Sequence, residues 1–283
     1  MSQFLTQIRA AFHYESEKEF TKAFNLFANC EKLSKQPTVV IKIKARMAWC
    51  QHSVGNIIQT EAIFSEIRSS FTNEPLSFLV HSKYLIKLKK YKSAKELLRE
   101  GIIRFPAYLE FYLVLASLLK DMERAGESIE ILKSALDQEV LTKGRGIDRK
   151  DIWAELGSLY FKRGDFNSSL ACLKKSLALC NSSDFLHYDL LANCYLEVDD
   201  TENAIRSLEA FIQYRGEVDA ETLILLARAE CRQGLIDEAS RHLILAYSFH
   251  DSLYLKGNDM TDFAPLLRNG FFTTLENVEW EDQ

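Results

Sequence analysis

A small residue is followed twelve positions later by a second small residue, and four positions after that by a large apolar residue, seven times along this sequence. The triplets are Ala11, Ala23 and Phe27; Ala48, Thr60 and Phe64; Ser82, Ala94 and Leu98; Ala116, Ser128 and Leu132; Gly157, Ser169 and Leu173; Ala192, Ala204 and Leu208; and Ala227, Ala239 and Leu243. They start 37, 34, 34, 41, 35 and 35 residues apart. Such a period is typical of a solenoid of helical hairpins. We therefore predict an all-α repeat protein without strands.

The triplets have a direct physical meaning in a pair of packed helices. Two helices approach closely only where neither carries a bulky side chain, so each small residue marks one side of a helix crossing. The first helix of a unit also has apolar residues at three- and four-residue steps, as in Trp153, Leu156 and Tyr160. Short turns follow, and Gly164 and Gly234 permit the positive φ that ends a helix. Each unit is therefore predicted to be a helical hairpin.

One unit carries nearly a full family consensus. Its matching residues are Trp153, Leu156, Gly157, Tyr160, Ser169, Leu173 and Ser176. The sequence thus resembles the tetratricopeptide repeat family, with similar units near Tyr112, Tyr188 and Leu223 and degenerate ones around Gln7 and Lys44. The resemblance implies a right-handed α-solenoid, a superhelix of about seven hairpins, over residues 1–253. Its units would start near residues 4, 41, 75, 109, 150, 185 and 220.

Three further segments complete the predicted organisation. Residues 254–283 look like the closing segment of many such arrays, so we expect a capping helix and a tail that cover the last hairpin. The 41-residue spacing reflects an insertion around Lys143–Gly146, a flexible loop by composition. The longest uncharged apolar run, Phe111–Leu119, is far short of the ~20 residues that span a bilayer. Without a secretory signal at residues 1–19, we expect no membrane span and a cytoplasmic location.

No motif of a known catalytic site occurs in the sequence. It lacks a phosphate-binding Walker loop, a G-x-S-x-G nucleophile turn and an H-E-x-x-H zinc motif. The six cysteines form no C-x-x-C pair, and the six histidines are scattered without metal-ligand spacing. The cysteines are interpreted as buried or half-buried thiols. We therefore predict a protein that is not an enzyme, with no catalytic residue, no metal site and no cofactor.

By resemblance, the first helices of the units line a concave groove. Their outward positions form one row of Phe12, Trp49, Lys83, Ser117, Ser158, Asn193 and Arg228, beside a second row of Ile8, Ala45, Leu79, Leu113, Ala154, Asp189 and Ile224. The predicted peptide-binding residues are Trp49, Lys83, Lys87, Asp189, Asn193 and Arg228. Packing against a neighbouring unit is the alternative for Phe12 and Trp49, since large aromatic residues are usually buried.

Some grooves of this family hold the C-terminal tail of heat-shock chaperones in a carboxylate clamp. Lys42 and Arg46 have the spacing of one basic pair of that clamp. Ile8 and Phe12 stand in the preceding unit, where the clamp requires Lys and Asn. Chaperone-tail binding is therefore not predicted.

Charge divides the chain into two unlike halves. Residues 1–150 hold 24 Lys and Arg against 17 Asp and Glu, a formal charge of +7, whereas residues 151–283 hold 11 against 23, a charge of −12. A basic cluster runs from Lys83 to Lys95, and it is either a binding site for acidic partners or a solvated turn. Opposite halves also permit head-to-tail self-association. Nucleic-acid binding is not predicted, because the chain is acidic overall and shows no basic-aromatic platform.

These observations favour a protein-protein interaction adaptor or scaffold that binds a peptide or helix of a partner protein in its groove. An assembly or secretion-type chaperone that shields a client protein is the alternative. Salt distinguishes the two, because a charged groove releases its partner at high ionic strength whereas buried apolar surface does not.

Overall fold

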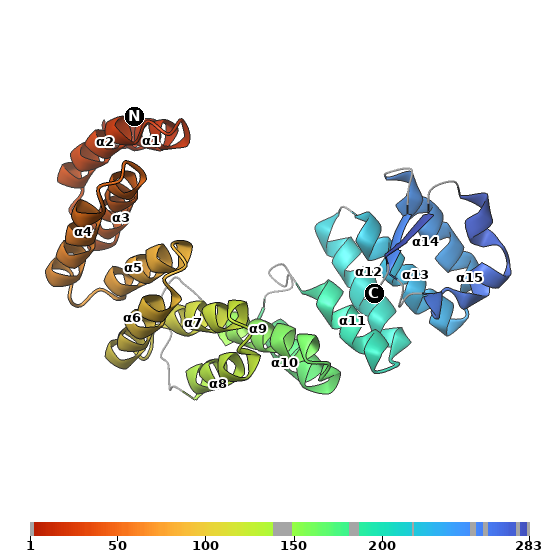
Figure 1. Cartoon of the computed structure of the whole chain (residues 1–283). Helices are drawn as coiled ribbons and strands as arrows, with labels where there is room; N and C mark the ends of the chain where they lie inside the picture. Colours follow the sequence, from red (N-terminus) through yellow and green to blue (C-terminus); the bar gives the residue numbers. More distant parts are fainter. Residues whose placement is uncertain are drawn as a thin grey trace. The chain divides into compact units, whose positions relative to one another are not determined.

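The computed structural model describes residues 3–137, 149–180, 187–216, 218–249, 253–256, 260–275 and 278–281. The chain forms two compact units, an N-terminal unit, Met1–Ile147, and a C-terminal unit, Asp148–Gln283. Each unit is a series of antiparallel helical hairpins (Figure 1). The predicted loop around Lys143–Gly146 lies outside the described residues. The fold is an all-α repeat solenoid.

The N-terminal unit contains four hairpins. Their helices are α1 (Gln3–Ser16), α2 (Phe20–Leu33), α3 (Pro37–Ser53), α4 (Ile57–Ser70), α5 (Pro75–Lys87), α6 (Tyr91–Arg104), α7 (Glu110–Asp121) and α8 (Ala125–Leu136). Pro37 and Pro75 occupy the first position of their helices, where a missing N–H costs nothing. An apolar core cluster extends from Ala11 of α1 to Leu119 of α7.

The C-terminal unit contains three hairpins and a closing segment. Its helices are α9 (Arg149–Lys162), α10 (Phe166–Leu179), α11 (Tyr188–Glu197), α12 (Thr201–Arg215), α13 (Ala220–Gln233) and α14 (Ile236–Ser248). The closing segment contains β1 (Leu253–Lys256), α15 (Ala264–Arg268), the 3₁₀ helix η2 (Phe271–Thr274) and β2 (Val278–Glu281).

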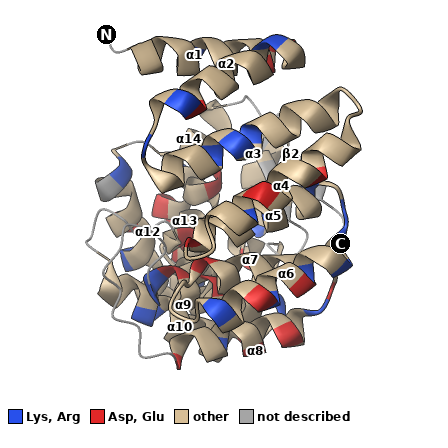
Figure 2. Ribbon diagram, turned by 90° about the vertical axis from the view of Figure 1, so that its left-hand side faces the viewer, with Lys and Arg blue, Asp and Glu red and all other residues tan. Residues whose placement is uncertain are grey.

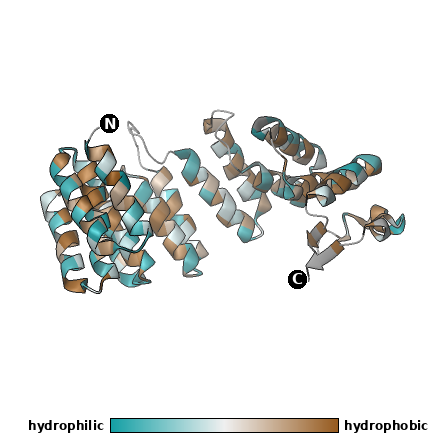
Figure 3. Ribbon diagram, turned by 90° about the horizontal axis from the view of Figure 1, so that it is seen from above, coloured by the Kyte–Doolittle hydropathy of each residue, from teal (hydrophilic) through white to brown (hydrophobic). Residues whose placement is uncertain are grey.

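Every residue of the seven triplets is buried. In three hairpins the second small residue also donates a hydrogen bond across the helix crossing: Thr60 to Ala48 O at 3.3 Å, Ser128 to Ala116 O at 2.8 Å and Ser169 to Gly157 O at 2.7 Å. Thr or Ser can therefore stand where other hairpins have Ala, because its buried hydroxyl has a hydrogen-bond partner. Hydrophobic and hydrophilic residues are both distributed along the helices (Figure 3).

Each of the seven hairpin turns contains one residue with a positive φ, between 57° and 85°. These residues are Lys18, Gly55, Lys89, Glu123, Gly164, Asp199 and Gly234. Each lies seven positions after the first small residue of its triplet. The turn is thus the same in every hairpin, although only three of the seven are the glycines that such a turn prefers.

Lys44 lies in α3 of the second hairpin, whose sequence departs from the repeat consensus, and its side chain is buried. Its ammonium group lies 3.0 Å from a Glu31 carboxylate oxygen and 2.7 Å from one of Glu66. Basic residues on α3 are visible in Figure 2. Two carboxylates from α2 and α4 therefore stabilise a charge where a consensus unit has an aromatic or Leu residue.

The closing segment contains two short strands in addition to the predicted capping helix. α15 covers the last hairpin as predicted, with Phe263 and Leu266 buried against α13 and α14 residues. The two strands were not predicted: β1 and β2 pair in parallel, with Leu253 opposite Val278. The alternating Leu253 and Leu255 are both buried. Four residues are too few for this alternation to be recognised in a sequence dominated by helical periods.

Candidate functional site

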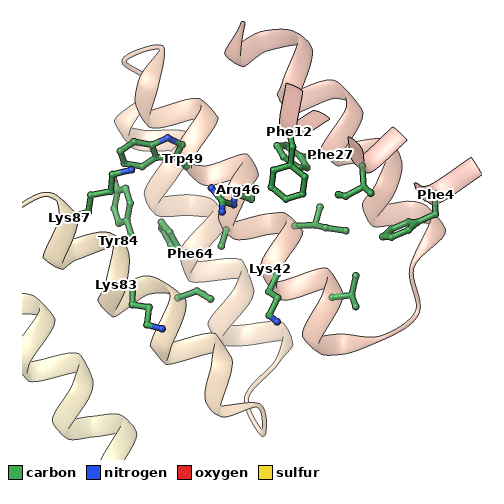
Figure 4. A pocket seen from close by; sticks show the side chains of 15 residues that line it. Phe4, Phe12, Phe27, Lys42, Arg46, Trp49, Phe64, Lys83, Tyr84 and Lys87 are labelled. Carbon is green, nitrogen blue, oxygen red and sulfur yellow. The ribbon is translucent and has the colours of Figure 1, made fainter. Parts of the chain in front are cut away.

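A groove of about 550 Å³ opens on the first helices of the first three hairpins (Figure 4). Its residues come mainly from α1, α3 and α5. They are Phe4, Ile8, Phe12, Phe27, Val39, Lys42, Ile43, Ala45, Arg46, Trp49, Phe64, Val80, Lys83, Tyr84 and Lys87. This volume is within the range of pockets that hold drug-sized molecules, so the groove has room for a few side chains of a ligand.

The helical period explains which residues converge here. Phe4, Ile8 and Phe12 are spaced by four, so they share one face of α1. Trp49 and Lys83 follow Phe12 at steps of 37 and 34 residues, the repeat spacing itself. The predicted row Phe12, Trp49 and Lys83 thus lines one groove, together with Lys87. Leu79 of the second row is buried, and its neighbour Val80 lines the groove instead.

The aromatic residues both line the groove and pack within the unit. Phe12 is 45% exposed and meets the Phe27 ring edge-on, with centroids 5.4 Å apart. Trp49 is half-buried, stacks on His52 at 5.6 Å and meets Tyr84 edge-on at 6.5 Å. The two alternatives stated for Phe12 and Trp49 therefore do not exclude each other. Packing against neighbouring rings orients each aromatic side chain, and both side chains also line the groove.

Four basic side chains reach the groove, and no Asp or Glu lines it. Lys83 lies 2.6 Å from Glu110, and Arg46 lies 3.1 Å from Glu15 and over the Phe12 ring. The Lys87 ammonium lies 3.4 Å from the centroid of the Trp49 ring, a cation–π contact. Lys42 is exposed, and no ion pair involves it in the described part of the unit. The groove is therefore apolar with a positive potential.

Only part of the basic cluster of the third hairpin lines the groove. Lys83 and Lys87 line the groove, whereas the four later lysines, from Lys89 to Lys95, belong to the turn and to α6 and do not line it. Lys42 and Arg46, which sequence reasoning considered only for a clamp, lie beside Lys83 and Lys87 in the groove. The sequence feature that could have identified them is their spacing, which places Lys42 and Arg46 on one face of α3 with Trp49.

His81 lies behind the groove wall. Its ring stacks on Phe64, with centroids 4.4 Å apart and planes within 6°. Both ring nitrogens are buried without a hydrogen-bond partner, and Glu61 comes no closer to Nε2 than 3.6 Å. Burial, with the charges of Arg68 and Lys90, lowers the pKa of His81 from 6.5 to about 4. The folded protein therefore holds this imidazole neutral.

We expect the free energy of unfolding to fall by up to about 3 kcal/mol between pH 6.5 and pH 4 on account of His81, because the unfolded chain binds a proton at the ordinary pKa and the folded chain does not. Urea unfolding measured at several pH values tests this. His81→Phe should flatten the dependence, whereas His13→Gln, a change at an exposed histidine, should leave it intact. Parallel curves for wild type and His81→Phe would contradict the assignment.

The three site residues predicted in the C-terminal unit are placed differently. Asp189 is exposed on α11, and the Asn193 amide donates a hydrogen bond to its backbone oxygen at 3.0 Å. Arg228 is not on an open groove surface, and this prediction is corrected: its side chain is buried, and it pairs with Asp262 of the closing segment at 2.9 Å. Arg228 instead faces the closing segment, which packs on α13.

Asp262 joins the closing segment to the last hairpin. It accepts hydrogen bonds from Arg228 at 3.0 Å and from Arg232 at 2.5 and 3.1 Å. Arg232 also donates to Leu196 O at 2.5 Å. Arg228 and Asp262 are 34 residues apart, and no local pattern marks them as partners. The cluster of Arg228, Arg232 and Asp262 holds the closing segment on the last hairpin, so Arg228 is not available to a ligand.

The described residues show no grouping of three His, Cys, Asp or Glu side chains that could hold a metal ion. Five cysteines are buried and Cys180 is half-buried, as predicted. None of the described helices has the length and apolar character needed to cross a bilayer.

Comparison with known proteins agrees with this geometry. A family model described as "Tetratricopeptide repeat" matches residues 151–183, which cover α10 and all but the first two residues of α9. The same triplet register and the same turn recur in the other six hairpins. Residues 151–183 match the tetratricopeptide repeat family, and the hairpins around them repeat the same architecture. No curated protein matches its sequence.

Solved tetratricopeptide structures have a similar fold. The C-terminal part of a repeat-containing protein from Cytophaga hutchinsonii aligns with a TM-score of 0.59 at 15% identity, over 90% of this chain and 98% of that one. PilW, a type IV pilus biogenesis factor, aligns at 0.55 and 20% identity, over 74% and 93%. YrrB, described as a TPR protein with an unusual peptide-binding site, aligns at 0.54 and 14%, over 66% and 92%. At these identities the likeness shows the fold alone.

Proposed function

We propose that this repeat protein is a non-catalytic adaptor whose N-terminal groove, lined by α1, α3 and α5, binds a peptide or helix of a partner protein. The groove residues lie on helices that are packed through the buried triplets, so the site is preformed. A preformed site loses little conformational entropy on binding, which leaves more of the contact energy as affinity. The cytoplasmic location stays a prediction, as does self-association through the two oppositely charged halves.

The observation that carries this proposal is an apolar groove lined by aromatic and basic side chains. Phe12 and Trp49 line the groove together with four basic side chains, two of which, Arg46 and Lys87, lie over their rings. Half-buried aromatic residues beside cations are typical of the anchor positions that dominate binding energy at protein interfaces. A solvated surface without a partner rarely keeps such residues together.

An assembly chaperone is the second candidate, and the continuous apolar face of α1 favours it. Phe4, Ile8 and Phe12 present only carbon surface to the groove. A client held by this face alone would stay bound at high salt, whereas a ligand held by the basic residues would be released. Binding measured at low and at high ionic strength separates the two candidates.

Replacing Phe12 and Trp49 by Ala is expected to remove the partner proteins that the wild-type chain captures from its native cell, with losses of at least tenfold. Ile58→Ala with Ile103→Ala is the matched control, because these residues are 90% and 82% exposed on α4 and α6, outside the groove. Mass spectrometry of material captured by the three proteins gives the readout. Thermal unfolding confirms that both variants are folded. An identical set of captured proteins for all three would contradict the proposal.

A further inference from the structure

The charge inside the groove is one-sided. Fifteen residues line it, of which four are basic and none is acidic. Arg46 and Lys83 already have carboxylate neighbours at the edge, Glu15 and Glu110. Lys42 and Lys87 have no such neighbour among the described residues of this unit, and the only charge-related contact of Lys87 is with the Trp49 ring. Two cations are therefore available to carboxylates from another molecule.

The groove is also divided into two kinds of wall (Figure 4). The α1 wall consists of Phe4, Ile8 and Phe12 and contributes no charge. All four cations come from α3 and α5, on the other side. A ligand that satisfies both walls must present apolar side chains in one direction and negative charge in the other.

We propose that the occupant of this groove is an internal acidic segment of a partner protein, whose large apolar side chains pack on α1 and whose Asp and Glu side chains pair with the cations of α3 and α5. This inference rests on the proposed function and specifies the chemistry of its ligand. Carboxylates are the protein groups that complement Lys and Arg in both charge and hydrogen bonding. The apolar anchors supply affinity, while the acidic groups supply selectivity and speed of association.

Two other negatively charged ligands fit less well. A terminal carboxylate is a single group, whereas the cations are distributed over two helices and two of them have no carboxylate neighbour. A nucleic-acid strand requires cations that follow its phosphates. The α1 wall offers none, and the whole chain has a net charge of −5.

Selection from a random peptide display library, with each peptide flanked on both sides by linker, tests the ligand class on the full-length protein. We expect the enriched peptides to combine several Asp or Glu with an aromatic or large aliphatic residue, and to lose binding to the Phe12→Ala/Trp49→Ala variant. Enriched groove-dependent peptides without acidic residues would overturn this inference and leave the proposed function standing. Enrichment of no groove-dependent peptide would contradict both.

Synthetic copies of the enriched peptides, with blocked ends, then test the cations. Lys42→Ser with Lys87→Ser should weaken binding about five- to tenfold at low salt. The matched control is Lys32→Ser with Lys92→Ser, which removes the same charge from exposed positions outside the groove and should change affinity less than twofold. Equal losses in both variants, tighter binding by a free C-terminus, or displacement by single-stranded poly(dT) would each overturn the proposal.

Discussion

Replacing Asp262 by Ala is expected to destabilise the C-terminal unit by about 3–5 kcal/mol, because the substitution leaves a buried guanidinium group without its counter-charge. The Arg228 side chain is 10% exposed and that of Asp262 is 5% exposed, so water reaches neither group well. The carboxylate also accepts two hydrogen bonds from Arg232, and both are lost with it. Hydrogen exchange of α13 and the closing segment, together with urea unfolding, measures the effect.

An exposed ion pair provides the control for this prediction. Glu202 and Arg206 pair on α12 with both side chains more than 60% exposed, so Glu202→Ala should cost less than about 1 kcal/mol. Replacing both Arg228 by Met and Asp262 by Leu should cost less than Asp262→Ala alone, since no buried charge remains at position 228. Equal stability of Asp262→Ala and the wild type would show that the closing segment is held by its apolar contacts alone.

Replacing Gly157 by Leu is expected to destabilise the α9–α10 hairpin by about 1–3 kcal/mol or more. A Cβ atom at this position would lie 2.7 Å from Leu173 Cγ and 3.4 Å from Ser169 O, so even the first added carbon forces the helices apart. The loss of the Ser169 hydrogen bond to Gly157 O would add to the cost. Thermal unfolding followed by circular dichroism gives the measurement.

Gly126 offers the matched control at a glycine in α8. A Cβ atom there meets nothing within 4 Å, and the residue is exposed. Gly126→Ala is therefore expected to be neutral or to stabilise by up to about 1 kcal/mol, because Ala has the higher helix propensity. A Gly157→Leu protein as stable as this control would mean that α9 and α10 do not cross at Gly157.

The repeat spacing predicts some of the groove residues but not all of them. Phe12, Trp49 and Lys83 were placed in one row by the repeat spacing, because equivalent positions of successive hairpins lie beside each other. Lys42 and Arg46 line the same groove, although their spacing alone matches only one basic pair of a carboxylate clamp. The place of these two cations in the groove depends on three hairpins together, and no single hairpin encodes it.

The seven hairpins were determined by the sequence itself. Their contacts are local: the small residues that meet are twelve positions apart, and each turn lies seven positions after the first of them, so the pattern is readable from neighbouring residues. Only the tertiary structure determined the long-range contacts of the C-terminal closing segment. The pairing of Arg228 with Asp262, and of β1 with β2, joins segments about 25 to 34 residues apart that have no shared period. Such contacts depend on how the closing segment packs on α13 and α14, and that packing removed Arg228 from the predicted groove.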